Sequence, residues 1–365
     1  MNIIKTIALY LLTFTTFSMT GQSQKGVWLT DVASTALDSK EGIEEVVRSC
    51  KTYGIEQIYV VVWNRGYTIY PSEVMEREFG KKVVPRFADR DVLKELIEIA
   101  HVNKIRVHAW FEFGFSSSYQ KADGGYILRE RPEWKAIDSK GNLVSKNGFQ
   151  WMNAFNPEVQ NFLLSLISEV VKNYDIDGIQ GDDRLPANPS TAGYDELTVS
   201  LYKNEHRGKA PPEDYKQPDW VNWRAKRLNL FAKKIYETIK EVKPNVAVTM
   251  APSIFPWSKE EYLQDWPTWV ENGWVDVIIP QVYRYNLKSY ISTLNATLEF
   301  MPENKNIALV PGVLLKVNDY TPSKGLLTKM IKENRKRGLD SEVFFFYEGF
   351  KEHERFFSKL YKKLK

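Results

Sequence analysis

Eight short apolar segments recur along this chain, and a helical pattern of apolar residues follows each of them. A segment such as residues 57–63 is continuously apolar after Gln57 rather than alternating, which is typical of a strand buried on both faces of a parallel sheet. Parallel strands need crossover helices between them, so the alternation predicts an α/β fold. Eight such units are what a closed (β/α)8 TIM barrel requires. The expected strands cover residues 25–30, 57–63, 105–112, 177–184, 246–251, 275–283, 307–312 and 343–347.

A doubly wound open sheet is the alternative arrangement of these elements. It is disfavoured because all eight strands are apolar and no Gly-x-Gly-x-x-Gly follows the first of them. The expected helices cover residues 41–53, 91–102, 157–174, 219–242, 259–273, 287–301, 322–338 and 350–362.

Two long stretches interrupt this alternation of strands and helices, at residues 113–156 and 185–218, after the third and fourth expected strands. Each stretch leaves and rejoins the same alternation of strand and helix. Long loops in compact domains are usually functional or disordered, and the first of these carries Trp134 and Trp151. We therefore interpret both as insertions over the barrel mouth and expect residues 25–365 to form a single domain.

The beginning of the chain has the pattern of a secretory signal peptide. Lys5 precedes an apolar stretch over residues 6–14, and small residues follow up to Gly21. We therefore expect residues 1–21 to be removed and the protein to be exported, either periplasmic or secreted. No later stretch is apolar enough to suggest a membrane span. The net charge is only +4 and no dense run of Lys and Arg occurs before the tail, so nucleic acid is not an expected partner.

The fourth expected strand ends in two adjacent carboxylates and an arginine, Asp182, Asp183 and Arg184. In a barrel the carboxyl ends of all strands share one mouth, where active sites form. A regular strand would aim Asp182 and Asp183 at opposite faces, so only one of them would face the cavity and the other would hold Arg184 or a neighbouring strand end.

Similar side chains end the other expected strands, and together they are the set that glycoside hydrolysis needs. One carboxylic acid protonates the leaving oxygen, and a second carboxylate attacks the sugar or activates water. Arg, Gln and Tyr can hydrogen-bond sugar hydroxyls, and aromatic rings can stack on sugar faces. The catalytic candidates are Asp182, Asp183, Glu112 and Glu348. The substrate-binding candidates are Asp31, Trp63, Asn64, Arg65, His108, Trp110, Trp151, Arg184, Trp257, Gln281, Tyr283 and Arg284.

Structural roles compete with these assignments. The aspartate pair could form an ion pair with Arg184 that only holds a loop, and Glu112 could fix an arginine at the mouth. Glu348 could cap the last helix, because it stands just before it. His108 fits a buried barrel histidine better than a catalytic one.

The tryptophans divide in the same way. Trp28, Trp63 and Trp110 fit the barrel core better than a sugar platform. Trp151 and Trp257, expected on loops, are the better platforms.

A metal site is a further possibility, because Asp31, His108 and Asp182 could in principle ligate a cation. The chain, however, has only four His and no His-x-His or His-x-x-x-His pair. It also has no Gly-x-Ser-x-Gly for a serine nucleophile. We therefore expect neither a metal nor another cofactor.

The chain resembles the glycosyl hydrolase-like family 10, formerly called domain of unknown function 187. Five segments carry the resemblance in order over nearly all of the chain after its first residues: 25–30 (Lys-Gly-Val-Trp-Leu-Thr), 107–114 (Val-His-Ala-Trp-Phe-Glu-Phe-Gly), 153–159 (Asn-Ala-Phe-Asn-Pro-Glu-Val), 175–183 (Asp-Ile-Asp-Gly-Ile-Gln-Gly-Asp-Asp) and 279–284 (Ile-Pro-Gln-Val-Tyr-Arg).

The resemblance implies an exported bacterial (β/α)8 barrel that cuts polysaccharide, including peptidoglycan glycan strands stripped of their peptides. It carries the family's acidic pair over to Asp182 and Asp183. The family usually has a bulky apolar residue before that pair, where this chain has Gly181. Many members have Asn-Pro at the end of the third strand, where this chain has Glu112 within Phe-Glu-Phe-Gly, so the resemblance does not extend to Glu112.

We therefore expect a glycoside hydrolase that cleaves glycosidic bonds in a polysaccharide or oligosaccharide by carboxylate chemistry. The alternative is a catalytically silent barrel that binds glycan without turnover. A third hypothesis is a barrel hydrolase or lyase that acts on a substrate other than sugar.

Overall fold

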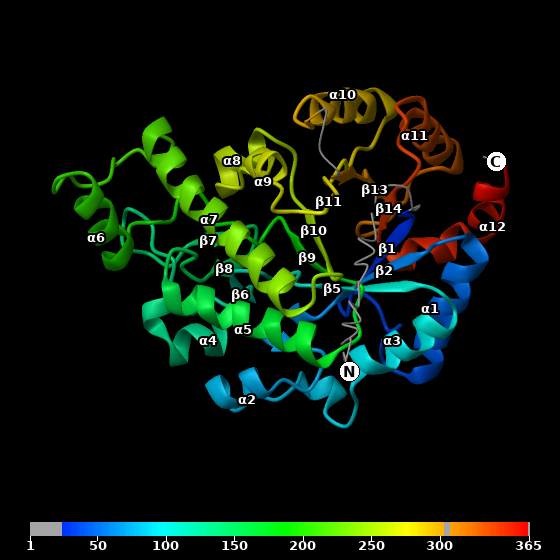
Figure 1. The fold of residues 1–365 in the computed structure, drawn as a ribbon, viewed down its shortest axis with the longest axis horizontal. Coiled ribbons are helices and arrows are strands. Elements are labelled where there is room, and N and C mark those ends of the chain that lie inside the picture. The colour runs from blue at the N-terminus through cyan, green and yellow to red at the C-terminus, as the bar shows by residue number, and fades with distance from the viewer. Residues whose placement is uncertain (1–23, 303–306, 364–365) are drawn as a thin grey trace, which may run out of the picture.

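The computed structural model describes residues 24–302 and 307–363 (Figure 1). The expected signal peptide lies outside the described residues. Every pairing in the main sheet is parallel. The strands of this sheet are β1 (Gly26–Leu29), β2 (Gln57–Val61), β5 (Arg106–Trp110), β9 (Gly178–Asp182), β10 (Ala247–Ala251), β11 (Val277–Ile278), β12 (Ala308–Leu309), β13 (Gly312–Leu314) and β14 (Val343–Phe345).

The sheet closes into a barrel through its seventh strand, which is broken in two. The strand order is β12-β11-β10-β9-β5-β2-β1-β14-β13, so β12 and β13 stand at opposite ends of the sheet although only two residues separate them in the chain. Pro311 lies between them and has no N–H to continue the ladder. A parallel bridge between Gln281 and Gly312 joins the two ends. The predicted (β/α)8 barrel is therefore confirmed.

Helices follow the strands and lie outside the barrel (Figure 1). Their faces toward the sheet are apolar, and side chains such as Ser39 and Asn156 accept hydrogen bonds from the first turns of their helices. The helices are α1 (Lys40–Tyr53), α2 (Glu73–Phe79), α3 (Val92–Val102), α5 (Pro157–Asn173), α7 (Pro218–Val242), α8 (Trp257–Tyr262), α9 (Trp266–Asn272), α10 (Leu287–Leu298), α11 (Lys324–Lys336) and α12 (Glu354–Lys363).

The sequence prediction was wrong in two details of the helices. Residues 259–273 form two helices, α8 and α9, because Leu263 adopts a left-handed conformation with φ of 57° and ends the first. The helix α2 follows the short hairpin of β3 (Trp63–Asn64) and β4 (Tyr67–Thr68) and was not predicted.

The two long stretches contain regular elements of their own. Residues 113–156 hold α4 (Gly125–Glu130) and an antiparallel sheet of β6 (Ser116–Tyr119), β8 (Phe149–Trp151) and β7 (Ser145–Lys146). Residues 185–218 hold α6 (Glu196–Glu205). Both therefore fold as ordered structure on the barrel.

A buried arginine anchors the second of these insertions to the barrel. Arg224 on α7 is fully buried, and its guanidinium donates to the carbonyl oxygens of Ser190, Ala192 and Tyr215.

Within the described residues, no helix is both long and apolar enough to cross a membrane.

His108 lies in the barrel interior rather than at the mouth. Its ring is fully buried and stacks on Tyr59 at a centroid distance of 4.6 Å. Burial lowers the pKa of His108 to about 3, so the imidazole is neutral. This is the structural role that the sequence favoured for His108.

Gly178 makes room for that histidine, and replacing it should destabilise the barrel. A Cβ at Gly178 would lie 2.2 Å from Nδ1 of His108, in a fully buried layer. We expect Gly178→Ala to lower the free energy of unfolding by about 1–3 kcal/mol, as overpacked cores do. Gly325→Ala on α11 is the matched control, because its nearest neighbour is 3.9 Å away. Denaturant unfolding of both variants checks this, and equal stabilities would contradict it.

Candidate active site

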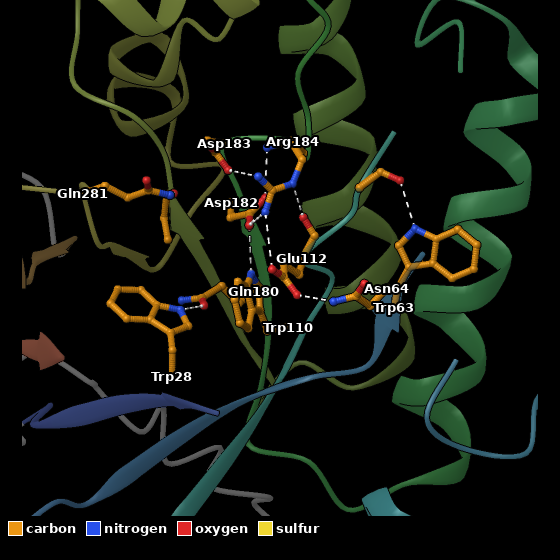
Figure 2. A network of polar contacts seen from close by, with 12 residues as sticks. Trp28, Trp63, Asn64, Trp110, Glu112, Gln180, Asp182, Asp183, Arg184 and Gln281 are labelled. Carbon is orange, nitrogen blue, oxygen red and sulfur yellow. Dashed lines mark hydrogen bonds and ion pairs between the residues drawn. The ribbon is translucent and has the colours of Figure 1, made fainter. Parts of the chain in front are cut away.

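A small cavity of about 90 Å³ opens at the carboxyl ends of the barrel strands. Figure 2 shows the polar network on one side of it. Side chains from strands well separated in the sequence meet there, as a barrel mouth requires. The cavity is lined by Trp28, Trp110, Glu112, Asp182, Asp183, Arg184, Ala251, Gln281, Tyr283 and Phe345.

Asp182 is the buried anchor of the network, with only 2% of its side chain exposed. Its Oδ2 accepts from Trp110 Nε1 at 3.1 Å and from Arg184 Nη2 at 3.0 Å, and its Oδ1 accepts from the Arg184 backbone N–H at 2.9 Å. Gln264 Nε2 donates to the Asp182 carbonyl oxygen at 2.7 Å. Burial raises the pKa of Asp182, whereas the charge of Arg184 opposes that rise. The side chain is therefore fixed in one orientation.

Asp183 also lines the cavity, which corrects the expectation that only one aspartate of the pair would do so. The strand β9 ends at Asp182, and the chain turns at once, so the alternation of faces stops there. Asp183 Oδ1 lies 3.1 Å from Arg184 Nη1, and 21% of the Asp183 side chain is exposed. The carboxylate therefore faces the cavity while it contacts the guanidinium.

The turn after β9 explains the glycine that stands before the acidic pair. A Cβ at Gly181 would lie 2.3 Å from the Leu185 carbonyl oxygen and 2.7 Å from Met250 Sδ. The returning chain occupies the space that a bulkier side chain would need. The tight turn after β9 therefore requires a glycine at position 181.

Glu112 provides the third carboxyl group, from the segment that follows β5. Asn64 Nδ2 donates to its Oε2, and Arg184 Nη2 lies 3.8 Å from its Oε1. Burial raises the pKa of Glu112 to about 7, in spite of the charge of Arg184, and the charges of Asp31 and Asp183 add to the rise. Glu112 is thus poised to hold or release a proton near neutral pH.

One guanidinium connects the three carboxyl groups, as Figure 2 shows. Arg184 Nε donates to the Glu112 carbonyl oxygen at 2.7 Å, and the guanidinium lies 4.7 Å from the centre of the Phe149 ring. Although burial would lower the pKa of Arg184, the charges of Asp182, Asp183 and Glu112 raise it. Arg184 therefore remains a cation at the centre of the site.

Aromatic and amide side chains form the rest of the cavity wall. The Tyr283 ring stacks on Phe345 at 5.2 Å and meets Trp28 edge-on at 6.4 Å. Trp28 Nε1 donates to Gln180 Oε1 at 2.6 Å below the cavity, and Gln281 Nε2 donates to the Ala251 carbonyl oxygen at 3.0 Å. Burial, then the charges of Asp183 and Asp182, raise the pKa of Tyr283 well above its usual range.

The comparison with protein families now decides what kind of barrel this is. A model of the family described as Glycosyl hydrolase-like 10 matches residues 23–322. The chain belongs to this family. The family resemblance seen in the sequence is thereby confirmed. The family, together with the glycoside hydrolase folds described next, supports a glycoside hydrolase-like function.

Relatives and solved structures agree with this membership. The chain is 23% identical to the glycosyl hydrolase DigH of Escherichia coli over 73% of this chain and 67% of DigH. It is 24% identical to the glycosyl hydrolase YngK of Bacillus subtilis, over 71% of this chain but only 54% of YngK. The fold is similar to the PgaB glycoside hydrolase domain of Bordetella bronchiseptica, with a TM-score of 0.69, 11% identity, and coverage of 93% and 98%. The catalytic domain of a Paenibacillus polymyxa β-amylase gives a TM-score of 0.64 at 11% identity, with coverage of 94% and 98%.

The predicted residues of the first and second strands lie around Glu112. Asn64 contacts it directly. Burial raises the pKa of Asp31, and the charges of Arg86 and Arg65 oppose that rise. Arg65 is therefore close enough to act on the Asp31 carboxyl group. Trp63 is different: it is fully buried and donates through Nε1 to the Gly114 carbonyl oxygen, away from the cavity.

Three further candidates do not line the cavity. Glu348 accepts from Ser34 Oγ at 2.7 Å and pairs with Lys351, so the structure leaves it outside the carboxyl cluster. Arg284 is held by the Tyr283 carbonyl oxygen and by Thr293 Oγ1. His108 lies deeper in the barrel, as described above.

Trp151 and Trp257, the two expected loop platforms, differ from each other. Trp151 is 1% exposed and packs against Tyr262, so it cannot present a ring face to a sugar, which corrects that expectation. Trp257 is 48% exposed at the start of α8.

Sequence reasoning missed several residues of the site. Trp28 was assigned to the core, and Phe345 and Ala251 were passed over, although all three stand at or near strand ends and line the cavity. The position of a residue at the end of an expected strand would have been a sufficient signal for Ala251. Phe345 lay in the middle of the expected strand 343–347, whereas β14 ends at Phe345. Gln264 offered no such signal, because it reaches Asp182 from the connection between α8 and α9.

No group of three or more His, Cys, Asp and Glu side chains in the described ranges is arranged to hold a metal ion. The three carboxyl groups at the mouth surround the Arg184 guanidinium instead.

Proposed function

We propose that this protein hydrolyses O-glycosidic bonds in a polysaccharide, with Glu112 as the general acid and Asp183 as the second carboxylate. The observation that carries the proposal is the pair of partly exposed carboxyl groups, Glu112 and Asp183, that one guanidinium holds at the barrel mouth. Family membership and the glycoside hydrolase folds of the structural neighbours support the same chemistry.

The surroundings of Glu112 suit an acid that protonates a leaving oxygen. Burial keeps its proton bound near neutral pH. Asn64 donates to Oε2, which leaves Oε1 to carry the proton. When that proton passes to the leaving group, the new carboxylate is stabilised by Asn64 and by the nearby charge of Arg184.

Asp183 is better placed than Asp182 to react with the sugar or to activate water. Asp182 has both carboxylate oxygens occupied by N–H donors and is almost completely buried. Asp183 keeps an exposed fraction of 21% and a single contact to Arg184 Nη1 at 3.1 Å. In this proposal Asp182 is a positioning residue that orients Arg184 and Trp110.

The cavity accommodates only the reacting part of a glycan, because about 90 Å³ is well below the roughly 300–1,000 Å³ of ordinary ligand pockets. The remaining sugar units would lie on the outer surface of the mouth.

We propose peptide-free peptidoglycan glycan as the first substrate to test. We also propose that the protein is exported and meets this polymer outside the cytoplasm. Release of new reducing ends from that glycan and from a panel of other polysaccharides is the experiment, and no release from any of them would contradict the proposal.

Glycan binding without turnover is the second candidate function. It is favoured by one observation, the contact of the Arg184 guanidinium with all three carboxyl groups, which would weaken each of them as a nucleophile. Binding to a panel glycan with no product after long incubation would support it.

The proposed acid role sets the direction of the pH dependence. Glu112 must be protonated to act as an acid, and its pKa is raised to about 7. Activity should therefore be retained below that pH and should decline tenfold per pH unit above it. A profile of kcat/KM against pH checks this, and activity that rises through pH 7 would contradict the assignment.

A further inference from the structure

Large aromatic side chains are exposed at the barrel mouth. Trp257 follows β10 and is 48% exposed, and Tyr285 follows β11 and is 63% exposed. The other large hydrophobic side chains with such exposure in the described part of the chain are aliphatic, and they lie on outer helices: Val102, Leu197 and Leu230. Exposed aromatic surface is thus concentrated at the end of the barrel that carries the carboxyl groups.

Tyr285 is held in place rather than free to rotate in solvent. Its ring meets Tyr320 at a centroid distance of 4.7 Å and an angle of 75°. Tyr320 belongs to the turn after β13, which is closed by two backbone hydrogen bonds between Val317 and Tyr320, of 3.0 and 2.9 Å. The edge-to-face contact between neighbouring loops therefore presents the exposed part of Tyr285 in a fixed orientation.

A short segment of chain links Tyr285 to the cavity wall. Tyr283, two residues earlier, lines the cavity and stacks on Phe345. Between them, Arg284 donates to the Tyr283 carbonyl oxygen at 2.7 Å and to Thr293 Oγ1 at 2.8 Å, which fixes this segment on α10. Tyr285 is therefore the next aromatic residue after Tyr283, and the segment that carries both is held in place.

The opposite side of the mouth is occupied by the insertion after β5. At the tip of its hairpin, Lys146 pairs with Glu261 at 2.7 Å and Asn147 Nδ2 donates to Tyr262 at 2.8 Å. In the same hairpin, the Phe149 ring lies 4.7 Å from the Arg184 guanidinium. In the barrel order, β13 lies across the ring from β5, so Tyr320 follows a strand on the opposite side of the barrel from the strand that precedes Glu112.

We propose that Tyr285, braced by Tyr320, is the stacking platform of a sugar-binding subsite away from the bond that is cut. The inference rests on the proposed glycoside hydrolase function. An aromatic face supplies a large, rigid apolar surface for the C–H face of a sugar ring. The subsite makes the protein selective for long glycan chains, because only these reach Tyr285 while a bond lies between Glu112 and Asp183.

Chain-length dependence tests this proposal. The substrates are short and long fractions of peptide-free peptidoglycan glycan strands, and the variants are Tyr285→Ala, Tyr285→Phe and Leu230→Ala. Tyr285→Ala should lower kcat/KM on the long fraction by about threefold to tenfold and leave the short fraction unchanged. Tyr285→Phe keeps the ring and should behave as the unaltered protein, as should Leu230→Ala on the outer face of α7.

An unchanged ratio of long to short turnover in Tyr285→Ala would overturn the subsite while leaving the hydrolase function intact. If the unaltered protein releases no reducing ends from either fraction, the hydrolase function fails for this glycan, and binding of the long fraction then decides. Weaker binding by Tyr285→Ala than by Tyr285→Phe would support the subsite, and equal binding would overturn it.

Discussion

Replacing Asp183 by Asn should lower kcat/KM for glycan cleavage by about a thousandfold or more, because it removes the carboxylate that attacks the sugar or activates water. The change keeps the size of the side chain, and 21% of that side chain is exposed, so folding should be retained. The measurement is the rate of reducing-end release together with the melting temperature of the variant.

Asp182→Asn is the informative comparison for this prediction. Asp182 is buried and accepts three N–H donors, so its replacement should lower stability as well as activity. A fully active Asp183→Asn beside a folded but inactive Asp182→Asn would contradict the assignment and transfer the reacting role to Asp182.

Replacing Glu112 by Gln should lower kcat by about 10²–10⁴-fold, the usual contribution of a positioned general acid. The amide keeps its contact with Asn64 but has no proton of suitable acidity to give. The decline of activity above about pH 7 should disappear with the carboxyl group. A substrate whose leaving group needs no proton, such as a nitrophenyl glycoside that the unaltered protein cleaves, should lose far less.

Glu348→Gln is the matched control for Glu112→Gln. Glu348 is a partly buried glutamate near the mouth that contacts Ser34 and Lys351 and does not line the cavity. Its replacement should leave cleavage unchanged. Equal losses in the two variants would show that the effect of Glu112→Gln is not specific to acid catalysis.

The barrel could be predicted from the sequence because its signals are local. Residues 58–61, for example, are apolar throughout because both faces of β2 are buried. The break in the seventh strand at Pro311 and the division of α8 from α9 at Leu263 depend on the path of the chain, so a periodic pattern does not reveal them.

The site could be predicted only in part, for a related reason. Strand ends identify which residues reach the mouth, and Asp182, Asp183, Glu112 and Arg184 do meet there. The insertions are not part of the strand pattern, so the sequence could not show that Trp151 would be buried under Tyr262. Nor could it show that the turn after β9 would bring both aspartates to the cavity.

The most direct test of the central proposal is to digest peptide-free peptidoglycan glycan and the polysaccharide panel in water labelled with heavy oxygen, and to weigh the products. Hydrolysis predicts that each new reducing end made by the unaltered protein carries one labelled oxygen, and that Asp183→Asn and Glu112→Gln make almost none. Products without the label, or binding with no product after long incubation, would contradict it.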